Sequence, residues 1–243
     1  KISGKLQMSI CSFIFNRLSL ISNSSNVLLS GYSHGRRRTE HDFIGERELP
    51  YEVYYGIQTL RALENFNITG IRLRDYPVFI KALAQVKKAA ALANEELGIL
   101  PKNISKYICL ACDEIVAGHW HDQFLVDMIQ GGAGTSTNMN ANEVIANRAL
   151  ELAGFEKGDY EKIHPNNHVN LGQSTNDAYP TAIRLAALQS FPNFHEALKE
   201  IIIAFKEKSV EFSDVIKMGR TQLQDAVPMT LGQEFEAFAI TLA

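Results

Sequence analysis

Long hydrophobic runs, cysteines and net charge are all scarce in this chain of 243 residues. No run of about eighteen apolar residues is present, so the sequence predicts no membrane-spanning helix. Three cysteines are too few for a disulfide framework and are typical of a reducing compartment. A formal net charge of −3 offers no field that would attract nucleic acid or an anionic membrane. We therefore expect a cytoplasmic protein with neither of these partners.

Acidic residues are absent from residues 1–39, which contain nine serines and six basic residues. This composition is typical of an organellar transit peptide, which would imply import, but it also fits a leader without a targeting role. An ordinary composition begins at Glu40. The chain starts with lysine, and its last residues still follow a helical period at Ala243. We therefore expect a fragment that is cut inside a helix.

Strand-like alternation is also scarce, and amphipathic helical patterns fill most of the chain after Glu40. Only residues 54–59 and 214–222 are typical of short strands. Asp177 is the predicted N-cap of a helix with Pro180 in its first turn. The helices are predicted at 78–98, 104–118, 141–154, 178–190, 193–216 and 231–243. The sequence thus predicts a mainly α protein, with an N-terminal helical domain at 40–176 and the start of a long-helix central bundle at 177–243.

Three polar islands interrupt the helical pattern, at residues 131–142, 164–177 and 219–233. Each contains hydroxyl and carboxamide side chains, which are neutral donors that hold a carboxylate without neutralising it. Glycines in the first island allow the backbone to approach a ligand, and the helix that follows favours an anion at its start. A single island of this kind fits a capped loop. Three in one helical chain predict a binding site for a small anion.

The segments GGAGTSTNMNANE, GQSTNDAYPT and MGRTQLQDAVPMTLGQE resemble the aspartase/fumarase superfamily, and within it the aspartate ammonia-lyases most closely. The resemblance runs from about Phe43 to Ala243. It implies an enzyme, a carbon–nitrogen lyase that reversibly converts L-aspartate to fumarate and ammonia without a cofactor. It also implies a homotetramer whose active sites are shared between subunits.

Proton removal beside the substrate carboxylate creates a doubly charged aci-carboxylate, which preorganised donors stabilise by about 3 kcal/mol each. The resemblance implies that Thr135, Ser174 and Thr175 hold this group. It implies that Asn176 and Thr221 hold the amino group or orient the substrate, with Gln222 beside them. The expected catalytic set is Thr135, Thr175, Thr221 and Gln222. Supporting or lining residues would be Ser136, Asn138 and Asn140, and a second anion site would contain His164, Asn166 and Asn167.

The chain departs from the superfamily pattern in one respect. Relatives carry a later loop, Gly-Ser-Ser followed by Met-Pro-x-Lys-x-Asn-Pro, whose serine acts as the base, and these 243 residues contain no such loop. We therefore expect the fragment alone to be inactive. Two alternatives stay open, a class II-type fumarate hydratase and a non-catalytic helical scaffold. Gln222 favours the aspartate reaction because fumarases have a titratable histidine there.

Some groups of residues look like metal-binding or catalytic sites but have simpler structural interpretations. Cys109 and Cys112 form a C-x-x-C beside His119 and His121, but we interpret them as small helix-face residues and predict no metal site. Lys87 and Lys88 are interpreted as part of a solvated helix face. Three acidic residues are expected to be surface or capping groups, namely Asp113, Glu114 and Asp127.

Overall fold

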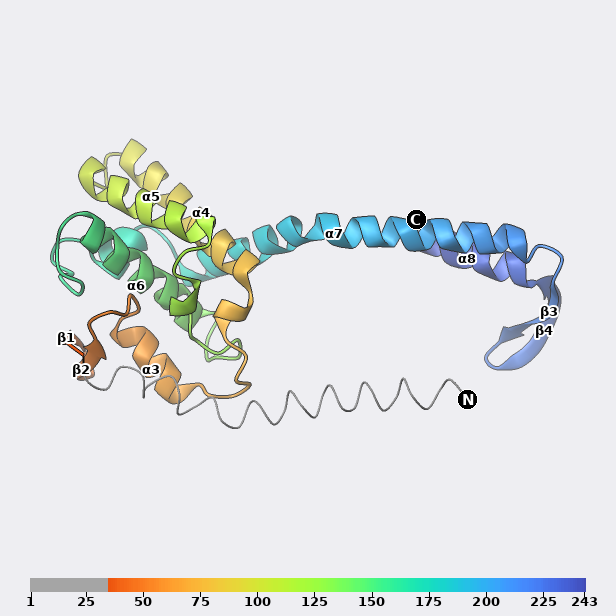
Figure 1. The fold of residues 1–243 in the computed structure, drawn as a ribbon, viewed down its shortest axis with the longest axis horizontal. Coiled ribbons are helices and arrows are strands. Elements are labelled where there is room, and N and C mark those ends of the chain that lie inside the picture. The colour runs from red at the N-terminus through yellow and green to blue at the C-terminus, as the bar shows by residue number, and fades with distance from the viewer. Residues whose placement is uncertain (1–34) are drawn as a thin grey trace. The chain divides into compact units, whose positions relative to one another are not determined.

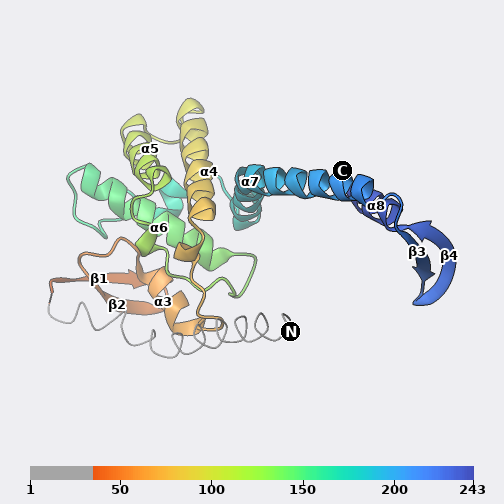
Figure 2. The same ribbon diagram turned by 45° about the vertical axis from the view of Figure 1, so that its right-hand side comes forward.

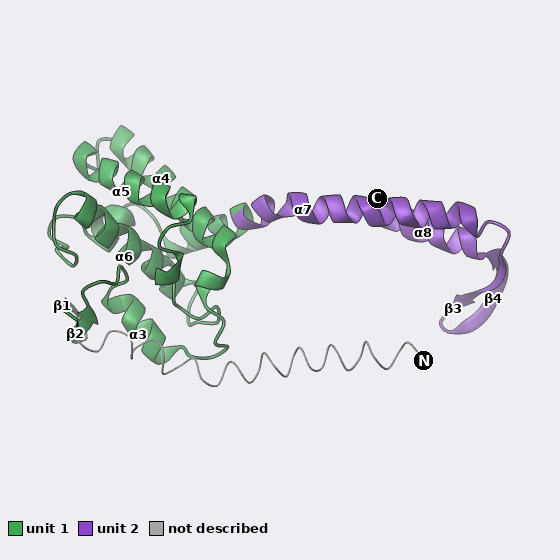
Figure 3. Cartoon of the chain, viewed as in Figure 1, with its two compact units in different colours: residues 1–185 green, residues 186–243 purple. Residues whose placement is uncertain are grey.

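The computed structural model describes residues 35–243, and helices dominate this part of the chain, as predicted. Most of the expected leader, residues 1–34, lies outside the described residues. The chain divides into two compact units, one ending at Leu185 and the other running from Ala186 to Ala243 (Figure 3). None of the helices in the described part has the length and apolar character needed to cross a bilayer.

The first unit begins with an antiparallel hairpin of β1 (Arg37–Asp42) and β2 (Gly45–Pro50). The sequence did not predict this hairpin, because its inward-facing side chains include charged ones. Arg38 is buried, and its guanidinium donates to Glu40 at 2.9 Å and to the carbonyls of Val53 and Tyr55 at 2.7 Å each. A charged residue buried with its partners breaks the apolar alternation on which strand prediction depends.

Helix α3 (Ile57–Asn65) is preceded by Gly56 at the N-cap position. The strand expected at 54–59 is therefore wrong. The local cause is a pair of carboxylates that accept hydrogen bonds from the first helical turn: Glu40 accepts from the Ile57 amide, and Glu143 accepts from the amides of Gln58 and Thr59. These acceptors satisfy amides that a helix start leaves without partners.

The remaining helices of the first unit include α4 (Pro77–Glu96), α5 (Lys102–Ala117) and α6 (Thr135–Leu152). The first two match the predicted ranges, whereas α6 begins earlier and takes in much of the first polar island. Short helical turns lie before α4 (η1, Leu73–Asp75), between α5 and α6 (η2, His121–Gln123) and after α6 (η3, Pro165–Val169).

The core of this unit forms where α4, α5 and α6 pack together. Helices α4 and α5 lie on one side of α6, and α3 with the β1–β2 hairpin lies on the other (Figure 1, Figure 2). Each helix contributes fully buried aliphatic side chains, and each such side chain stabilises the fold by about 1.5–3 kcal/mol. Examples are Ile80, Leu83, Ile108, Ile115, Ile145 and Leu150.

Helix α6 is buried although much of its sequence is polar. Asn140 accepts a hydrogen bond from the Leu125 amide and donates to the Gln123 carbonyl, at 3.0 Å each. Asn147 donates to the Tyr54 carbonyl and accepts from the Gly158 amide, at 2.8 Å each. Because these side chains fix backbone segments on both sides of the helix, α6 holds the loops of the first unit in place.

Among these polar side chains of α6, Glu143 is the one whose loss is expected to cost most. Glu143→Ala is expected to destabilise the first unit by about 3 kcal/mol or more. The carboxylate is 1% exposed and accepts from the amides of Gly56, Gln58 and Thr59 at 2.8–3.0 Å. The Thr59 hydroxyl also donates to it, so its removal takes the acceptor from four donors, of which all but the Gln58 amide are buried. Urea unfolding of Glu143→Ala and of the exposed control Glu96→Ala measures the difference, and equal stabilities would contradict the expectation.

Helix α7 (Thr175–Glu211) starts in the first unit and continues into the second. The helices predicted at 178–190 and 193–216 are therefore one continuous helix through Glu211. In the second unit α7 is followed by β3 (Ile216–Thr221), β4 (Gln224–Thr230) and α8 (Leu231–Leu242). Phe205 of α7 packs against Phe235 and Phe238 of α8, with ring centroids 5.8–5.9 Å apart.

The third polar island forms an antiparallel hairpin rather than an open loop. The strand predicted at 214–222 is confirmed as β3, but β4 was missed. Thr221 pairs with Gln224, which leaves Gln222 and Leu223 as a two-residue turn with φ of 49° and 64°. Positive φ at both turn residues usually selects Asn-Gly, so this turn adopts its conformation without the residues that favour it.

Candidate active site

The first two polar islands meet through the side chain of Asn138. This residue lies in the first turns of α6 and is 2% exposed. Its amide group donates to Asn170 Oδ1 at 3.1 Å and to Thr175 Oγ1 at 3.2 Å. Two segments 32 and 37 residues away in sequence are therefore fixed to one helix.

The bond from Asn138 also orients the Thr175 hydroxyl. Because Thr175 Oγ1 accepts from Asn138, its own hydrogen is directed to another acceptor. Thr175 is the first residue of α7, where unsatisfied amides and the helix dipole favour an anion. The Thr175 hydroxyl therefore keeps a hydrogen that Asn138 does not use, at the first residue of this helix.

The start of α7 differs from the prediction that Asp177 is its N-cap. Ser174 precedes the helix, and its hydroxyl oxygen accepts from the Asn176 amide at 3.1 Å. Asp177 lies inside the first turn, and its carboxylate accepts from the Ser174 amide at 3.3 Å. The Ser174 hydroxyl thus caps the amide of the second helical residue, and Asp177 satisfies the Ser174 amide in return, which explains why the helix begins two residues before Asp177.

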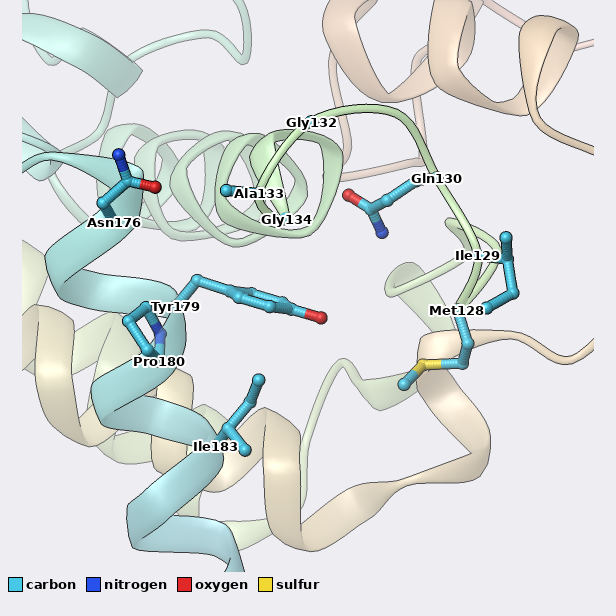
Figure 4. Close-up of a pocket in the computed structure, with 10 residues that line it drawn as sticks. All are labelled: Met128, Ile129, Gln130, Gly132, Ala133, Gly134, Asn176, Tyr179, Pro180 and Ile183. Atoms are coloured by element: carbon cyan, nitrogen blue, oxygen red, sulfur yellow. The ribbon is translucent and has the colours of Figure 1, made fainter.

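A cavity of about 510 Å³ opens between the first island and the start of α7. The Gly132–Gly134 loop and Asn176 line it, and the Tyr179 ring extends from α7 beneath that loop (Figure 4). A Cβ on Gly134 would lie 2.4–2.6 Å from the Tyr179 ring. The loop thus approaches α7 as closely as it does because position 134 is a glycine.

A second cavity, of about 500 Å³, is lined by Thr135 together with His164 and Asn166. His164 Nδ1 accepts from the amides of Asn166 and Asn167 at 3.0 and 3.2 Å. Burial lowers the pKa of His164, and nearby His168 lowers it further. A neutral imidazole that holds a turn is a weaker anion receptor than the imidazolium a second anion site would favour.

The other residues expected at the site have varied surroundings. Asn140 is fully buried against the 123–125 backbone, so it supports the site rather than lining it. Ser136 is half-buried on α6. Thr221 and Gln222 belong to the second unit, where they form the end of β3 and the hairpin turn.

Lys87 is a neighbour of this site that sequence reasoning missed. It was expected on a solvated face, but its side chain is 0% exposed, so that interpretation is wrong. Its ammonium donates to Asn170 Oδ1 at 2.8 Å and to Gln173 Oε1 at 3.0 Å. Position 87 continues the buried helical series of Ile80, Leu83 and Ala91, which is the signal that could have found it.

The C-x-x-C segment lies on α5, with Cys112 fully buried and Cys109 half-buried. Burial raises the pKa of both thiols, which keeps them protonated. Within residues 35–243, no cluster of three or more histidine, cysteine or acidic side chains has the arrangement of a metal site.

The fold and the site define a mainly helical protein in which neutral hydroxyl and carboxamide donors meet at a helix start. The sequence model of one protein family, described as lyase, matches residues 45–243. The chain belongs to this lyase family.

Two curated relatives show how much of the family sequence is present. The chain is 64% identical over 203 residues to an aspartate ammonia-lyase of Helicobacter pylori strain J99, an alignment that covers 84% of this chain and 43% of the relative. It is 55% identical over 206 residues to the aspartate ammonia-lyase of Escherichia coli K12, again covering 84% and 43%. The chain therefore spans less than half the length of these relatives.

Solved structures extend the similarity to the fold. A fumarate lyase:delta crystallin from Brucella melitensis is 60% identical, with a TM-score of 0.75, over 84% of this chain and 46% of that one. A class II fumarase from Schistosoma mansoni is 40% identical, with a TM-score of 0.72, over 85% of this chain and 43% of that one.

Proposed function

We propose that the complete protein containing this chain is an aspartate ammonia-lyase, which reversibly converts L-aspartate to fumarate and ammonia. The observation that carries the proposal is the bond from Asn138 to Thr175, because Thr175 Oγ1 accepts it and keeps its own hydrogen for another acceptor at the start of α7. The high identity to aspartate ammonia-lyases supports it.

The chemistry that these residues suit is stabilisation of negative charge on a carboxylate. In our proposal Thr135, Ser174 and Thr175 donate to the aci-carboxylate formed when a proton leaves the neighbouring carbon. Neutral donors suit this role because they bind the developing charge without transferring a proton to it. Asn138 Oδ1 is buried and accepts no hydrogen bond within the described residues.

The runner-up function is hydration of fumarate to malate, as the similarity to a class II fumarase suggests. Gln222 decides between the two in our proposal. A carboxamide does not titrate near neutral pH, so it cannot exchange the proton that a histidine could. It can orient an amino group, which is the task the aspartate reaction requires.

We further propose that the complete protein assembles as a homotetramer with active sites shared between subunits. The second unit supports this, because its helices expose many large apolar side chains, which usually mark an interface. These are Leu188, Phe191, Phe194, Ile201, Ile203, Val210, Phe238 and Ile240. In such an assembly Thr221 and Gln222 would act in a site that also contains residues of other subunits.

The ultraviolet absorbance of fumarate tests the function directly. The protein to assay is this chain joined to the rest of its own gene product or to the matching C-terminal part of the Helicobacter pylori relative. Fumarate should form from L-aspartate much faster than from L-malate. Faster formation from L-malate would establish the fumarase alternative, and no turnover of either by a folded tetramer would favour the scaffold.

A further inference from the structure

Lys87 is a buried cation whose hydrogen-bond partners are neutral. Its ammonium is held by the carboxamide oxygens of Asn170 and Gln173, at 2.8 and 3.0 Å. Both residues belong to the second polar island. Burying a charge costs free energy unless an opposite charge compensates it. A lysine in this position therefore needs a physical explanation.

The elements packed against α4 bring no compensating charge to Lys87. Helix α5 brings the Cys112 thiol, whose charge in its ionised form would raise the pKa of the lysine. Helix α6 brings Asn138, and the segment after η3 brings neutral carboxamides. Within residues 35–243, no carboxylate forms an ion pair with Lys87, whereas its neighbour Lys88 is paired with Asp113. Desolvation accordingly lowers the pKa of Lys87 to about 7.

Asn170 connects this cation to the proposed substrate site. Its Oδ1 accepts from Lys87 and from Asn138 at the same time, at 2.8 and 3.1 Å. Asn138 in turn donates to Thr175 Oγ1. The ammonium and the Thr175 hydroxyl are therefore joined by three consecutive hydrogen bonds through Asn170 and Asn138.

We propose that Lys87 is a positioning residue that holds Asn170 and Asn138 beneath Thr175, and that its positive charge is the counter-charge for a dicarboxylate bound there. The inference rests on the proposed function for the identity of that ligand. Because an anion favours the charged lysine, binding raises the pKa of Lys87. By linkage, anion binding takes up a proton near neutral pH and weakens as the pH rises above about 7.

Lys87→Met is the decisive variant, and Lys88→Met is its matched control on the same helix. Methionine keeps the approximate length and removes both the charge and the hydrogen-bond donors, so the desolvation cost of the ammonium is lost together with its bonds to Asn170 and Gln173. The second control, Lys87→Arg, stays charged at all accessible pH values. Thermal unfolding of all variants confirms that the comparison is made between folded proteins.

The measurement is calorimetric binding of succinate, a dicarboxylate with no amino group to lose, to the complete tetramer between pH 6 and 9. Running each titration in buffers of different ionisation enthalpy gives the number of protons taken up. We expect the wild type and Lys88→Met to take up part of a proton at pH 8 and to bind more weakly as the pH rises. We expect Lys87→Met to take up none, to bind about tenfold more weakly at pH 6, and to show little pH dependence.

The kinetic counterpart is the pH profile of KM for L-aspartate. Lys87→Met should raise KM about tenfold below pH 7 and flatten its pH dependence, while a folded Lys87→Arg should retain tight binding at high pH. Proton uptake in Lys87→Met equal to that of the wild type would overturn the inference and leave the lyase function intact. Absence of lyase turnover together with Lys87-dependent succinate binding would overturn the function and leave the role of Lys87 intact.

Discussion

Thr175→Val is expected to lower kcat/KM for L-aspartate by about 100- to 1,000-fold in the complete protein. Valine has nearly the shape of threonine, so the change removes the donor and little else. The loss should be large because the Thr175 oxygen accepts from Asn138, which in our proposal leaves the hydroxyl hydrogen for the substrate carboxylate. Initial rates of fumarate formation measure the effect.

The matched control is Thr175→Ser, which keeps the hydroxyl and removes only a methyl group. It should retain most of the wild-type rate, whereas Thr175→Val should not. Circular dichroism should show the same helix content in both. A Thr175→Val enzyme with near-wild-type kcat/KM would remove Thr175 from the site.

Gly134→Ala should be the most damaging single methyl addition in the first unit. Gly134 has φ of +89°, which costs an L-residue about 1–2 kcal/mol. The added Cβ would also lie 2.4–2.6 Å from the Tyr179 ring, so the loop and α7 must move apart. We expect a loss of about 3 kcal/mol or more in the free energy of unfolding, together with weaker succinate binding.

Gly154→Ala separates the cost of backbone strain from the cost of the clash with the Tyr179 ring. Gly154 has φ of +82°, and nothing lies within 4 Å of a Cβ added there. This control therefore reports the backbone strain alone, and Gly134→Ala should exceed it by the cost of the clash. Urea unfolding of both variants gives the comparison, and equal losses would show that the Tyr179 ring moves aside freely.

The helical part of the fold could be predicted because its cause is local. The apolar period of α5 and the left-handed glycine that ends it at Gly118 both lie within one stretch of sequence. The polar islands were visible for the same reason, since hydroxyl and carboxamide residues cluster in the chain itself. The contact between Asn138 and Thr175 was not predicted, because no local pattern encodes a contact across 37 residues, and the resemblance only assigned both residues to one pocket.

The wrong predictions concern polar groups whose hydrogen-bond partners lie far away in the sequence. Lys87 looked solvated because a lysine beside a lysine usually is, yet its partners lie 83 and 86 residues away. Helix α3 looked like a strand because the carboxylates that fix its start belong to β1 and α6. A hydropathy pattern shows which side chains are polar, but it contains no information about where their hydrogen-bond partners lie.

The buried polar face of α6 has a consequence for how the first unit folds. Asn147 reaches a carbonyl 93 residues away, and Glu143 reaches an amide 87 residues away. Before those distant segments are in place, burying these polar side chains breaks hydrogen bonds to water without forming new ones. The isolated α6 helix is therefore expected to be marginally stable. We therefore expect α6 to become stable only together with long-range loop closure, which would slow folding and couple the early and late parts of the unit into one cooperative transition.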